Sequence, residues 1–390
     1  MVNSGRILLL DFCNYEDYPI GGYLSFARNM IQSFGPAIAL VGITTNDSDP
    51  VGKWFRKEIN GEEYDYFSIA RYSASKTKHL IPDRLISWLL IKVFSRRIFN
   101  IGIRNIFVQR QEILLAIPGI DRMNICYCFA GLENPLSISK YHYARYLSRE
   151  FESLFFTKLR FAQTILASGD DLAIDEMAGR SRGKVSPEQI EKFPTRVNTD
   201  IFRTIDKETA RGYLNLPISK IIIINTGRLA PLKGWKFMVD CFIGFEKKRP
   251  DSLFYFIGDG EDYNEIKQYI SDNNLSEKIV LAGNRNLHEI ALFLNAADLF
   301  VMGSYKEGWS TSLMEAVACG VPVCTTDFSS ARDIVLNGVN GFVSDNRDQQ
   351  QFVYYMIEAI KLSRPVWNEH VTRHSVEKMK EDILSLWELS

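Results

Sequence analysis

The chain has 390 residues, which is long for one hydrophobic core and favours two domains of about 200 residues each. Its 46% hydrophobic and 24% charged residues are typical of an ordinary soluble globular protein, and a net charge of −1 argues against a nucleic-acid-binding protein. None of the six cysteines forms a CxxC pair, so neither a zinc knuckle nor a disulfide framework is indicated and a reducing cytoplasm is the simplest setting. The amino terminus leads directly into an expected strand, without a secretory signal segment, and no apolar run is long enough to span a bilayer.

The first half of the chain predicts a doubly wound domain. Strands are expected near residues 6–12, 37–44, 64–69, 106–109, 124–129 and 164–167, and helices near 22–34, 84–99 and 139–162. This alternation implies a parallel sheet with right-handed crossovers. After the first strand, Gly21 and Gly22 allow a tight turn that brings backbone close to a ligand, although glycines that only form a turn are more common.

A basic region lies between Arg71 and Arg110, where nine cationic residues accompany one acidic residue. Within it, residues 84–99 predict a helix rich in Trp, Leu, Ile and Phe with cations at its ends and flanks. A basic helix with exposed apolar residues can lie in an anionic membrane interface. The alternative is that its apolar face packs on the first-domain sheet.

In the second half, the expected strands end in glycines and charged residues. Strands are predicted at 221–226, 253–257, 278–282 and 298–304. The loops after the first three are Gly227 to Gly234, which contains Arg228 and Lys233, then Gly258-Asp259-Gly260, then Gly283-Asn284-Arg285. Because parallel strands place their carboxyl ends at one edge, these groups should converge, and the arginine fork and lysine charge suit phosphate oxygens.

The fourth strand leads into a turn with two carboxylates around it. Glu307 lies in the turn and Glu315 lies early in a helix predicted from Thr311 to Cys319. The first amides of a helix lack internal partners and carry the positive end of its dipole, so a diphosphate would be well placed there. The two carboxylates could then accept hydrogen bonds from the hydroxyls of a sugar and of a ribose in one ligand. The alternative is an acidic helix start capped by Ser310 or Thr311.

Together these motifs resemble the retaining GT-B glycosyltransferases of the family 4 type, the glycosyl transferases group 1. The resemblance is carried by Gly227-Arg228-Leu229 with Lys233-Gly234, Gly258-Asp259-Gly260, the pair Glu307 and Glu315, Ala318-Cys-Gly320-Val-Pro322-Val, Val197-Asn198-Thr-Asp200-Ile-Phe202, and Asn337-Gly338-Val-Asn-Gly341. It covers residues 195 to 345, and the first half of the chain matches mainly in layout.

The resemblance implies an α/β GT-B fold with two doubly wound, Rossmann-like domains facing across a cleft. Residues 1–200 would form the acceptor-side domain and residues 201–369 the domain that binds the nucleotide-sugar. A C-terminal helix at about 370–390 would pack back on the first domain.

The resemblance also implies roles for individual residues. Arg228 and Lys233 would hold the nucleotide diphosphate and stabilise the charge of the leaving group. Glu307 would contact hydroxyls of the donor sugar, and Glu315 would accept a hydrogen bond from the ribose. The other donor-binding residues would be Gly22, Gly227, Gly258, Arg285, Trp309, Ser310, Thr311 and Ser312.

This chain departs from the family pattern in two places. Ser310 stands where glycine is common, so that Trp309 and Ser310 reshape the sugar end of the expected pocket. The histidine that the family commonly carries after the strand at 124–129 is missing, and the nearest histidine is His142. Glu133 and Asn134 stand in that loop as candidates for contacts to sugar or acceptor, the alternative being a turn before Pro135 that caps the next helix.

The implied activity is transfer of a sugar from a UDP- or GDP-sugar to a hydroxyl of a glycan or lipid-linked acceptor, with retention of configuration. Synthesis of a bacterial surface polysaccharide or glycolipid is the expected setting, in the cytoplasm or peripherally on the inner face of the cytoplasmic membrane, to which residues 71–110 would bind. No cofactor and no metal are required, and Asp47-Ser48-Asp49 is expected to form a turn with a helix cap rather than a metal site. The alternatives are a sugar-nucleotide epimerase, a glycogen-type phosphorylase, or a non-catalytic partner subunit with the same fold.

Overall fold

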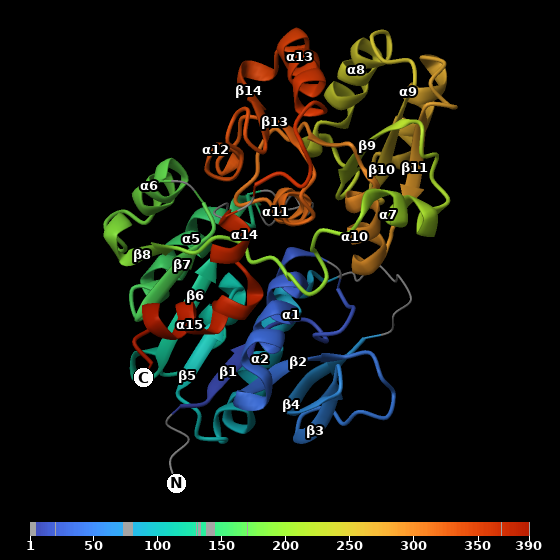
Figure 1. Ribbon diagram of the computed structural model, residues 1–390. Coiled ribbons are helices and arrows are strands. Elements are labelled where there is room, and N and C mark those ends of the chain that lie inside the picture. The colour runs from blue at the N-terminus through green and yellow to red at the C-terminus, as the bar shows by residue number, and fades with distance from the viewer. Residues whose placement is uncertain are drawn as a thin grey trace. The chain divides into compact units, whose positions relative to one another are not determined.

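A computed structural model describes residues 5–19, 21–72, 81–129, 131, 134–137, 145–169, 171–367 and 369–389. The chain divides into two compact units: Met1–Pro194 with Val376–Ser390, and Thr195–Ser375. Each unit contains one mostly parallel sheet with helices on both faces (Figure 1). Among the described residues, no helix combines the length and hydropathy that a membrane span needs.

The first unit contains an eight-stranded sheet in the order β3-β4-β2-β1-β5-β6-β7-β8. The strands are β1 (Ile7–Leu10), β2 (Ile38–Thr44), β3 (Trp54–Ile59), β4 (Glu62–Arg71), β5 (Asn105–Val108), β6 (Asn124–Phe129), β7 (Thr164–Ala167) and β8 (Ile190–Lys192). All neighbours pair in parallel except β3 and β4. The chain proceeds from β1 to β2 on one side and later to β5 on the other, so the point where the strand order reverses lies between β1 and β5.

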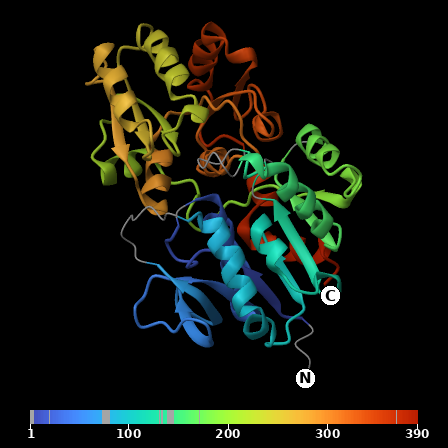
Figure 2. The same ribbon diagram turned by 180° about the vertical axis from the view of Figure 1, so that it is seen from behind.

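The helices of the first unit form a layer on each face of this sheet. They are α1 (Gly22–Phe34), α2 (Asp83–Phe99), α3 (Gln111–Ala116), α5 (Ser148–Leu159), α6 (Asp171–Arg180) and α15 (Val376–Leu386), with short 3₁₀ turns at Gly35–Ala37, Ile120–Arg122 and Pro187–Gln189. Leu9 packs in a core with α1 and α15, whereas its neighbour Leu8 packs in a core with α2, α3, α5 and α6. Figure 2 shows the face of the sheet that is covered by α2, α3, α5 and α6.

Two strands of the first unit are not predicted from the sequence. β8 is only three residues long, and β3 forms a hairpin with β4. The hairpin turn is Asn60-Gly61, and both residues have positive φ, 53° and 83°. An Asn-Gly pair between two strands is a strong hairpin signal because such turns need this conformation, so β3 could have been predicted. The predicted helix at 139–162 is α5, which ends at Leu159, and residues 138–144 lie outside the described part of the chain.

The second unit contains a six-stranded parallel sheet in the order β11-β10-β9-β12-β13-β14. Its strands are β9 (Ile221–Thr226), β10 (Ser252–Ile257), β11 (Ile279–Gly283), β12 (Leu299–Met302), β13 (Val323–Thr326) and β14 (Gly341–Ser344). Its helices are α7 (Lys207–Leu214), α8 (Trp235–Glu246), α9 (Tyr263–Asp272), α10 (Leu287–Ala296), α11 (Thr311–Ala318), α12 (Ala331–Ile334), α13 (Gln349–Ala359) and α14 (Glu369–Arg373), with 3₁₀ turns at Pro231–Lys233 (η4) and Asp345–Arg347.

The chain passes between the units at positions that differ from the sequence-based boundaries. The first passage lies between Pro194 and Thr195 rather than at residue 200. The second lies between Ser375 and Val376 rather than near residue 370, because the short helix α14 belongs to the second unit. Only α15 returns to the first unit, where it packs on α1.

A buried arginine joins α7 to the start of β12. The side chain of Arg211 is 2% exposed, and its guanidinium donates to Asp298 at 2.6 Å. Its remaining hydrogen bonds go to the main-chain carbonyls of Ala296, Pro217, Ile218 and Lys220. Asp298 also accepts the amide of Ile222 at 2.8 Å, so this ion pair fixes the positions of β9 and β12 relative to α7.

Replacing this arginine should destabilise the second unit strongly. Arg211→Met leaves the Asp298 carboxylate without its buried partner, and we expect a loss of about 3–5 kcal/mol in the free energy of unfolding. Lys207→Met is the matched control, because Lys207 also binds Asp298 but is 41% exposed, and it should lose less than about 1 kcal/mol. Urea unfolding of both variants measures the difference, and equal losses would contradict the role of the buried pair.

Candidate functional site

Loops after neighbouring strands of the second unit approach one another at glycines. A Cβ atom on Gly258 would lie 1.9 Å from the carbonyl oxygen of Gly227, and one on Gly260 would lie 2.1 Å from that of Leu229. The amide of Leu229 donates to the carbonyl of Asp259 at 3.0 Å. Only glycine fits such close backbone contacts, so the loops that follow β9 and β10 are held together at the carboxyl edge of the sheet.

A second close approach brings Lys233 to Glu307. A Cβ atom on Gly234 would lie 1.9 Å from the carbonyl oxygen of Gly303, so η4 lies directly against the chain that follows β12. Lys233 Nζ then donates to Glu307 Oε1 at 2.6 Å, and Ser304 Oγ donates to the same oxygen at 2.7 Å. The Oε2 atom of Glu307 takes no hydrogen bond from the described residues, so it can accept one from a ligand.

The other two predicted cations lie on the loops where the sequence placed them. The side chain of Arg228 is 67% exposed, with Nε 3.8 Å from Glu261. Arg285 follows β11 and lies 3.4 Å from Glu289. The structure therefore joins Lys233 to Glu307 and pairs Arg228 and Arg285 with nearby carboxylates.

The start of α11 is capped by Ser310. Its Oγ accepts the amide of Leu313 at 3.4 Å, so the alternative interpretation of this residue as a helix cap is confirmed. Capping uses one of the free amides and leaves the others for a ligand. Thr311 is exposed and Ser312 is half-buried beside the hydroxyl of Ser310, 3.4 Å away. Trp309 is half-buried.

Glu315 lies in α11, and its carboxylate is poorly hydrated. The residue is half-buried, and none of the described residues forms a hydrogen bond or ion pair with its side chain. Burial raises the pKa of Glu315 to about 8. A carboxyl group without a protein partner at the edge of the sheet is suited to a ligand that supplies hydroxyl donors.

In the first unit, Gly22 is the first residue of α1. This helix has no side-chain cap and no acidic residue in its first turn, so its first amides are open to a ligand. Asn134 is 8% exposed, its Nδ2 donates to the carbonyl of Ser148 and its Oδ1 accepts the amide of Leu136. These contacts favour the turn interpretation of Asn134. Glu133 and His142 lie outside the described residues.

A buried charged cluster at the carboxyl ends of β1 and β5 is not predicted from the sequence. Asp11, which is fully buried, accepts from Arg110 Nε and from Gln109 Nε2 at 3.1 Å. The Arg110 guanidinium lies 4.2 Å from the centre of the Tyr23 ring. Glu112 binds Arg84 at 3.3 Å. The cluster fills the point where the strand order reverses. The signal in the sequence is that Asp11 follows β1 immediately and Arg110 stands two residues after the end of β5.

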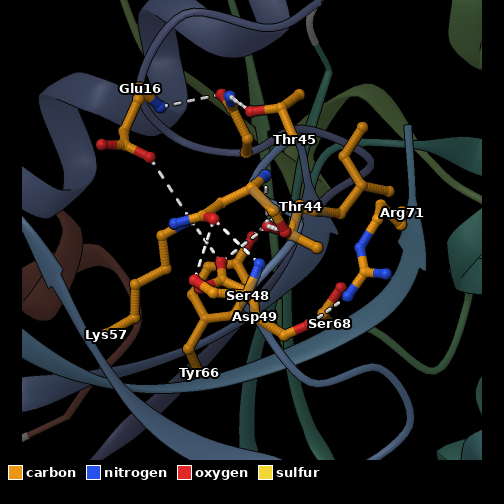
Figure 3. A network of polar contacts seen from close by, with 12 residues as sticks. Glu16, Thr44, Thr45, Ser48, Asp49, Lys57, Tyr66, Ser68 and Arg71 are labelled. Carbon is orange, nitrogen blue, oxygen red and sulfur yellow. Dashed lines mark hydrogen bonds and ion pairs between the residues drawn. The ribbon is translucent and has the colours of Figure 1, made fainter. Parts of the chain in front are cut away.

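The segment Asp47-Ser48-Asp49 forms a turn, and its second carboxylate is bound by protein groups. Asp49 accepts the hydroxyl of Thr44 at 2.6 Å and lies 3.2 Å from the Lys57 ammonium, which also contacts Glu16 (Figure 3). The predicted turn is confirmed, but the strand β3 follows it instead of a capped helix. Within the described part of the chain, no three His, Cys, Asp or Glu side chains are grouped as metal ligands.

Solved structures define the fold class. The sucrose-phosphate synthase of Thermosynechococcus elongatus aligns with a TM-score of 0.73 at 16% identity, over 99% of this chain and 100% of that chain. The HepE protein of Anabaena, solved in complex with UDP-glucose, aligns with a TM-score of 0.68 at 17% identity, over 97% of this chain and 99% of that chain. The two units therefore form the GT-B fold, with two Rossmann-like domains of α/β structure.

The family model of glycosyl transferases group 1 matches residues 206–375. A UDP-Gal:α-D-GlcNAc-diphosphoundecaprenol α-1,3-galactosyltransferase of Escherichia coli is 28% identical over 214 residues, which is 52% of this chain and 55% of the relative. A poly(glycerol-phosphate) α-glucosyltransferase of Bacillus subtilis is 31% identical over 183 residues, which is 45% of this chain and 27% of the relative. The family model and these relatives support the glycosyltransferase group 1 family. The chain spans about half the length of the Escherichia coli relative and about a quarter of the length of the Bacillus subtilis relative.

The raised pKa of Glu315 should make stability depend on pH. A carboxyl whose folded pKa of about 8 exceeds its ordinary value of 4.5 binds its proton more tightly in the folded state, so it stabilises the protein at low pH and this contribution is lost as the pH rises through about 8. Glu315→Gln should therefore lose less thermal stability than the wild type between pH 5 and pH 9. Glu381→Gln, at an exposed position, is the control. Parallel curves for Glu315→Gln and the wild type would contradict the desolvation of this group.

Proposed function

We propose that the protein is a retaining glycosyltransferase that moves a sugar from a UDP- or GDP-sugar to a hydroxyl of a glycan or lipid-linked acceptor. The observation that carries this proposal is the contact of Lys233 with Glu307 at the carboxyl edge of the second sheet, close in the chain to the start of α11. A cation, a carboxylate with one free oxygen and helix amides are suited to a ligand that contains both a diphosphate and hydroxyls.

In the proposed reaction the bond between the sugar C1 and the diphosphate oxygen breaks, and the acceptor oxygen bonds to C1 on the same face. The leaving diphosphate oxygen takes the proton of the acceptor hydroxyl. Lys233 and Arg228 act on the negative charge that develops on the leaving group, which is where a cation lowers the barrier. Glu307 and Glu315 bind hydroxyls of the sugar and the ribose. No metal or cofactor takes part in this scheme.

The known activities for which the relatives are named support the acceptor class. The Escherichia coli relative is named for transfer to a sugar carried on diphosphoundecaprenol, a lipid-linked acceptor, and the Bacillus subtilis relative for transfer to poly(glycerol-phosphate). We extend this to a role in bacterial surface polysaccharide or glycolipid synthesis. Donor and acceptor would bind to different units, as the two-domain fold allows.

Removing the leaving-group cations should abolish most of the activity. We expect Lys233→Ala and Arg228→Ala each to lower turnover by a factor of about one hundred or more with the fold intact. Lys236→Ala is the matched control, because Lys236 is an exposed cation three residues further along the same segment. Nucleotide release from UDP- and GDP-sugars, with and without acceptor, measures the effect.

The outcomes of this assay also separate the alternatives. Release of UDP or GDP only with acceptor present indicates a transferase. Isomerised sugar without release would indicate an epimerase, and no donor binding would indicate a non-catalytic subunit. Near-normal transfer by both variants would refute the role of the two cations.

We further propose that α2 binds an anionic membrane surface. The helix has apolar residues on two sides: Ile91 and Ile98 are buried in the core, whereas Leu85, Leu89 and Val93 are 52%, 52% and 64% exposed. Spacings of four residues place the exposed set on one face of the helix. The core-packing alternative therefore applies to one side of α2 and leaves the other open.

The exposed face of α2 also carries cations. Two cations, Lys92 and Arg96, lie on the same side of the helix as the aromatic residue Trp88, at spacings of four residues. All three residues are exposed. Apolar side chains flanked by cations suit the boundary between lipid headgroups and acyl chains. This surface would hold the enzyme where a lipid-linked acceptor is presented.

Vesicle flotation tests the membrane proposal. The wild type should float with vesicles of phosphatidylglycerol and not with vesicles of phosphatidylcholine. Reversing two charges in Lys92→Glu with Arg96→Glu should weaken binding at least tenfold, since each basic residue near the surface contributes about 1 kcal/mol. Arg97 is left intact because it donates to the carbonyl of Gly52. Lys247→Glu with Lys248→Glu, on the second unit, is the control, and equal flotation of both double variants would overturn the proposal.

A further inference from the structure

The segment 303–310, which we call the donor loop, is held by side chains that donate to its main-chain carbonyls. Thr326 Oγ1 donates to the carbonyl of Ser304 at 2.8 Å. Ser330 Oγ donates to the carbonyl of Gly308 at 2.8 Å, and Thr195 Oγ1 donates to that of Trp309 at 2.9 Å. Thr326 and Ser330 lie on the segment around the end of β13, and Thr195 is 114 residues from the peptide it binds, so two separate segments hold the loop.

The hydroxyls of Ser330 and Thr195 also set the direction of two amides. In a trans peptide the C=O and the following N–H point in opposite directions. Fixing the carbonyls of Gly308 and Trp309 therefore directs the N–H groups of Trp309 and Ser310 away from the two hydroxyls. Among the described residues, neither amide donates a hydrogen bond. Both stand immediately before α11, where the helix dipole favours an anion.

Thr195 is also the first residue after the chain enters the second unit. Two residues later, the amide of Val197 donates to the carbonyl of His374 at 3.0 Å, and Val197 pairs with Ser375, the last residue before the chain leaves this unit. The Trp309 ring lies edge-on against His374, with 5.6 Å between the ring centres. The donor loop is thus in contact with both segments that connect the units.

We propose that Thr195 and Ser330 are positioning residues that aim the amides of Trp309 and Ser310 at the diphosphate of the donor. Because Thr195 lies on the connecting segment, it also couples donor binding to the conformation of that segment. This inference rests on the proposed function, since it assigns a role to groups that support the nucleotide-sugar site. Neither residue contacts the reacting atoms in this account.

Titration calorimetry with UDP and with GDP tests the proposal. Thr195→Val keeps the shape of the side chain and removes the hydroxyl, so the Kd for the nucleotide should rise about three- to tenfold, the usual effect of losing one hydrogen bond. Thr195→Ser should restore the wild-type Kd, which a general loss of stability would not allow. Thr209→Val, which removes an exposed hydroxyl from the first turn of α7, should leave the Kd unchanged.

Steady-state kinetics supply a second measurement. In Thr195→Val the KM for the donor should rise while the KM for the acceptor stays within error of the wild type. Ser330→Ala should show the same pattern, so the proposal remains testable if one variant fails to fold. Unchanged nucleotide affinity in the folded variants would overturn the inference, whereas a wild type that binds neither UDP nor GDP would overturn the proposed function itself.

Discussion

The candidate site depends on two backbone contacts that only glycine permits. Gly258 against Gly227 and Gly234 against Gly303 bring loops from different strands to within van der Waals distance of one another. A Cβ atom at Gly258 or Gly234 would lie 1.9 Å from a carbonyl oxygen of the neighbouring loop, so a side chain there would push the loops apart. At Gly234 this displacement would disturb the contact between Lys233 and Glu307. The charge arrangement at the edge of the sheet is therefore a result of main-chain packing, and the strands beneath it serve to hold these loops in register.

The two units use charge in different ways. In the second unit, burial raises the pKa of Glu315 to about 8 and no described residue bonds to its side chain, so the hydrogen-bonding capacity of this carboxyl is left for a ligand. In the first unit, Asp11 and Arg110 neutralise each other at the equivalent edge of the sheet, where burial would otherwise disfavour both charges. The first cluster is therefore satisfied within the protein, whereas in the second unit the unpartnered carboxyl of Glu315 remains available to the hydroxyls of a ligand.

Much of the fold is predictable from the sequence, because buried parallel strands are continuous apolar runs. Ile221–Thr226 is predicted to the residue, and α2 to within one residue at its start. The antiparallel strand β3 is missed because three consecutive charged residues, Arg56 to Glu58, interrupt its apolar residues, and only the Asn60-Gly61 turn after it indicates a hairpin. The fold class is confirmed by the solved structures, whereas the roles of the site residues stay predictions.

The site was harder to predict than the fold. Motif spacing predicts that Lys233 and Glu307 share a sheet edge, but their direct contact depends on how closely two loops approach. Thr195 and Ser330 could not be found from sequence, since serine and threonine are common and the peptides they bind are 114 and 22 residues away along the chain. The basic helix illustrates another limit: the composition of α2 fits both packing and membrane binding, and only the exposure of individual side chains shows that it has two apolar sides.

The serine at position 310 has a consequence for the thermodynamics of ligand capture. Its hydroxyl already fixes the first turn of α11 by accepting the amide of Leu313. A glycine at this position would leave the turn free to sample several conformations, and an incoming anion would have to order it. Here that loss of entropy occurs during folding, so nucleotide association should be accompanied by a smaller unfavourable entropy change.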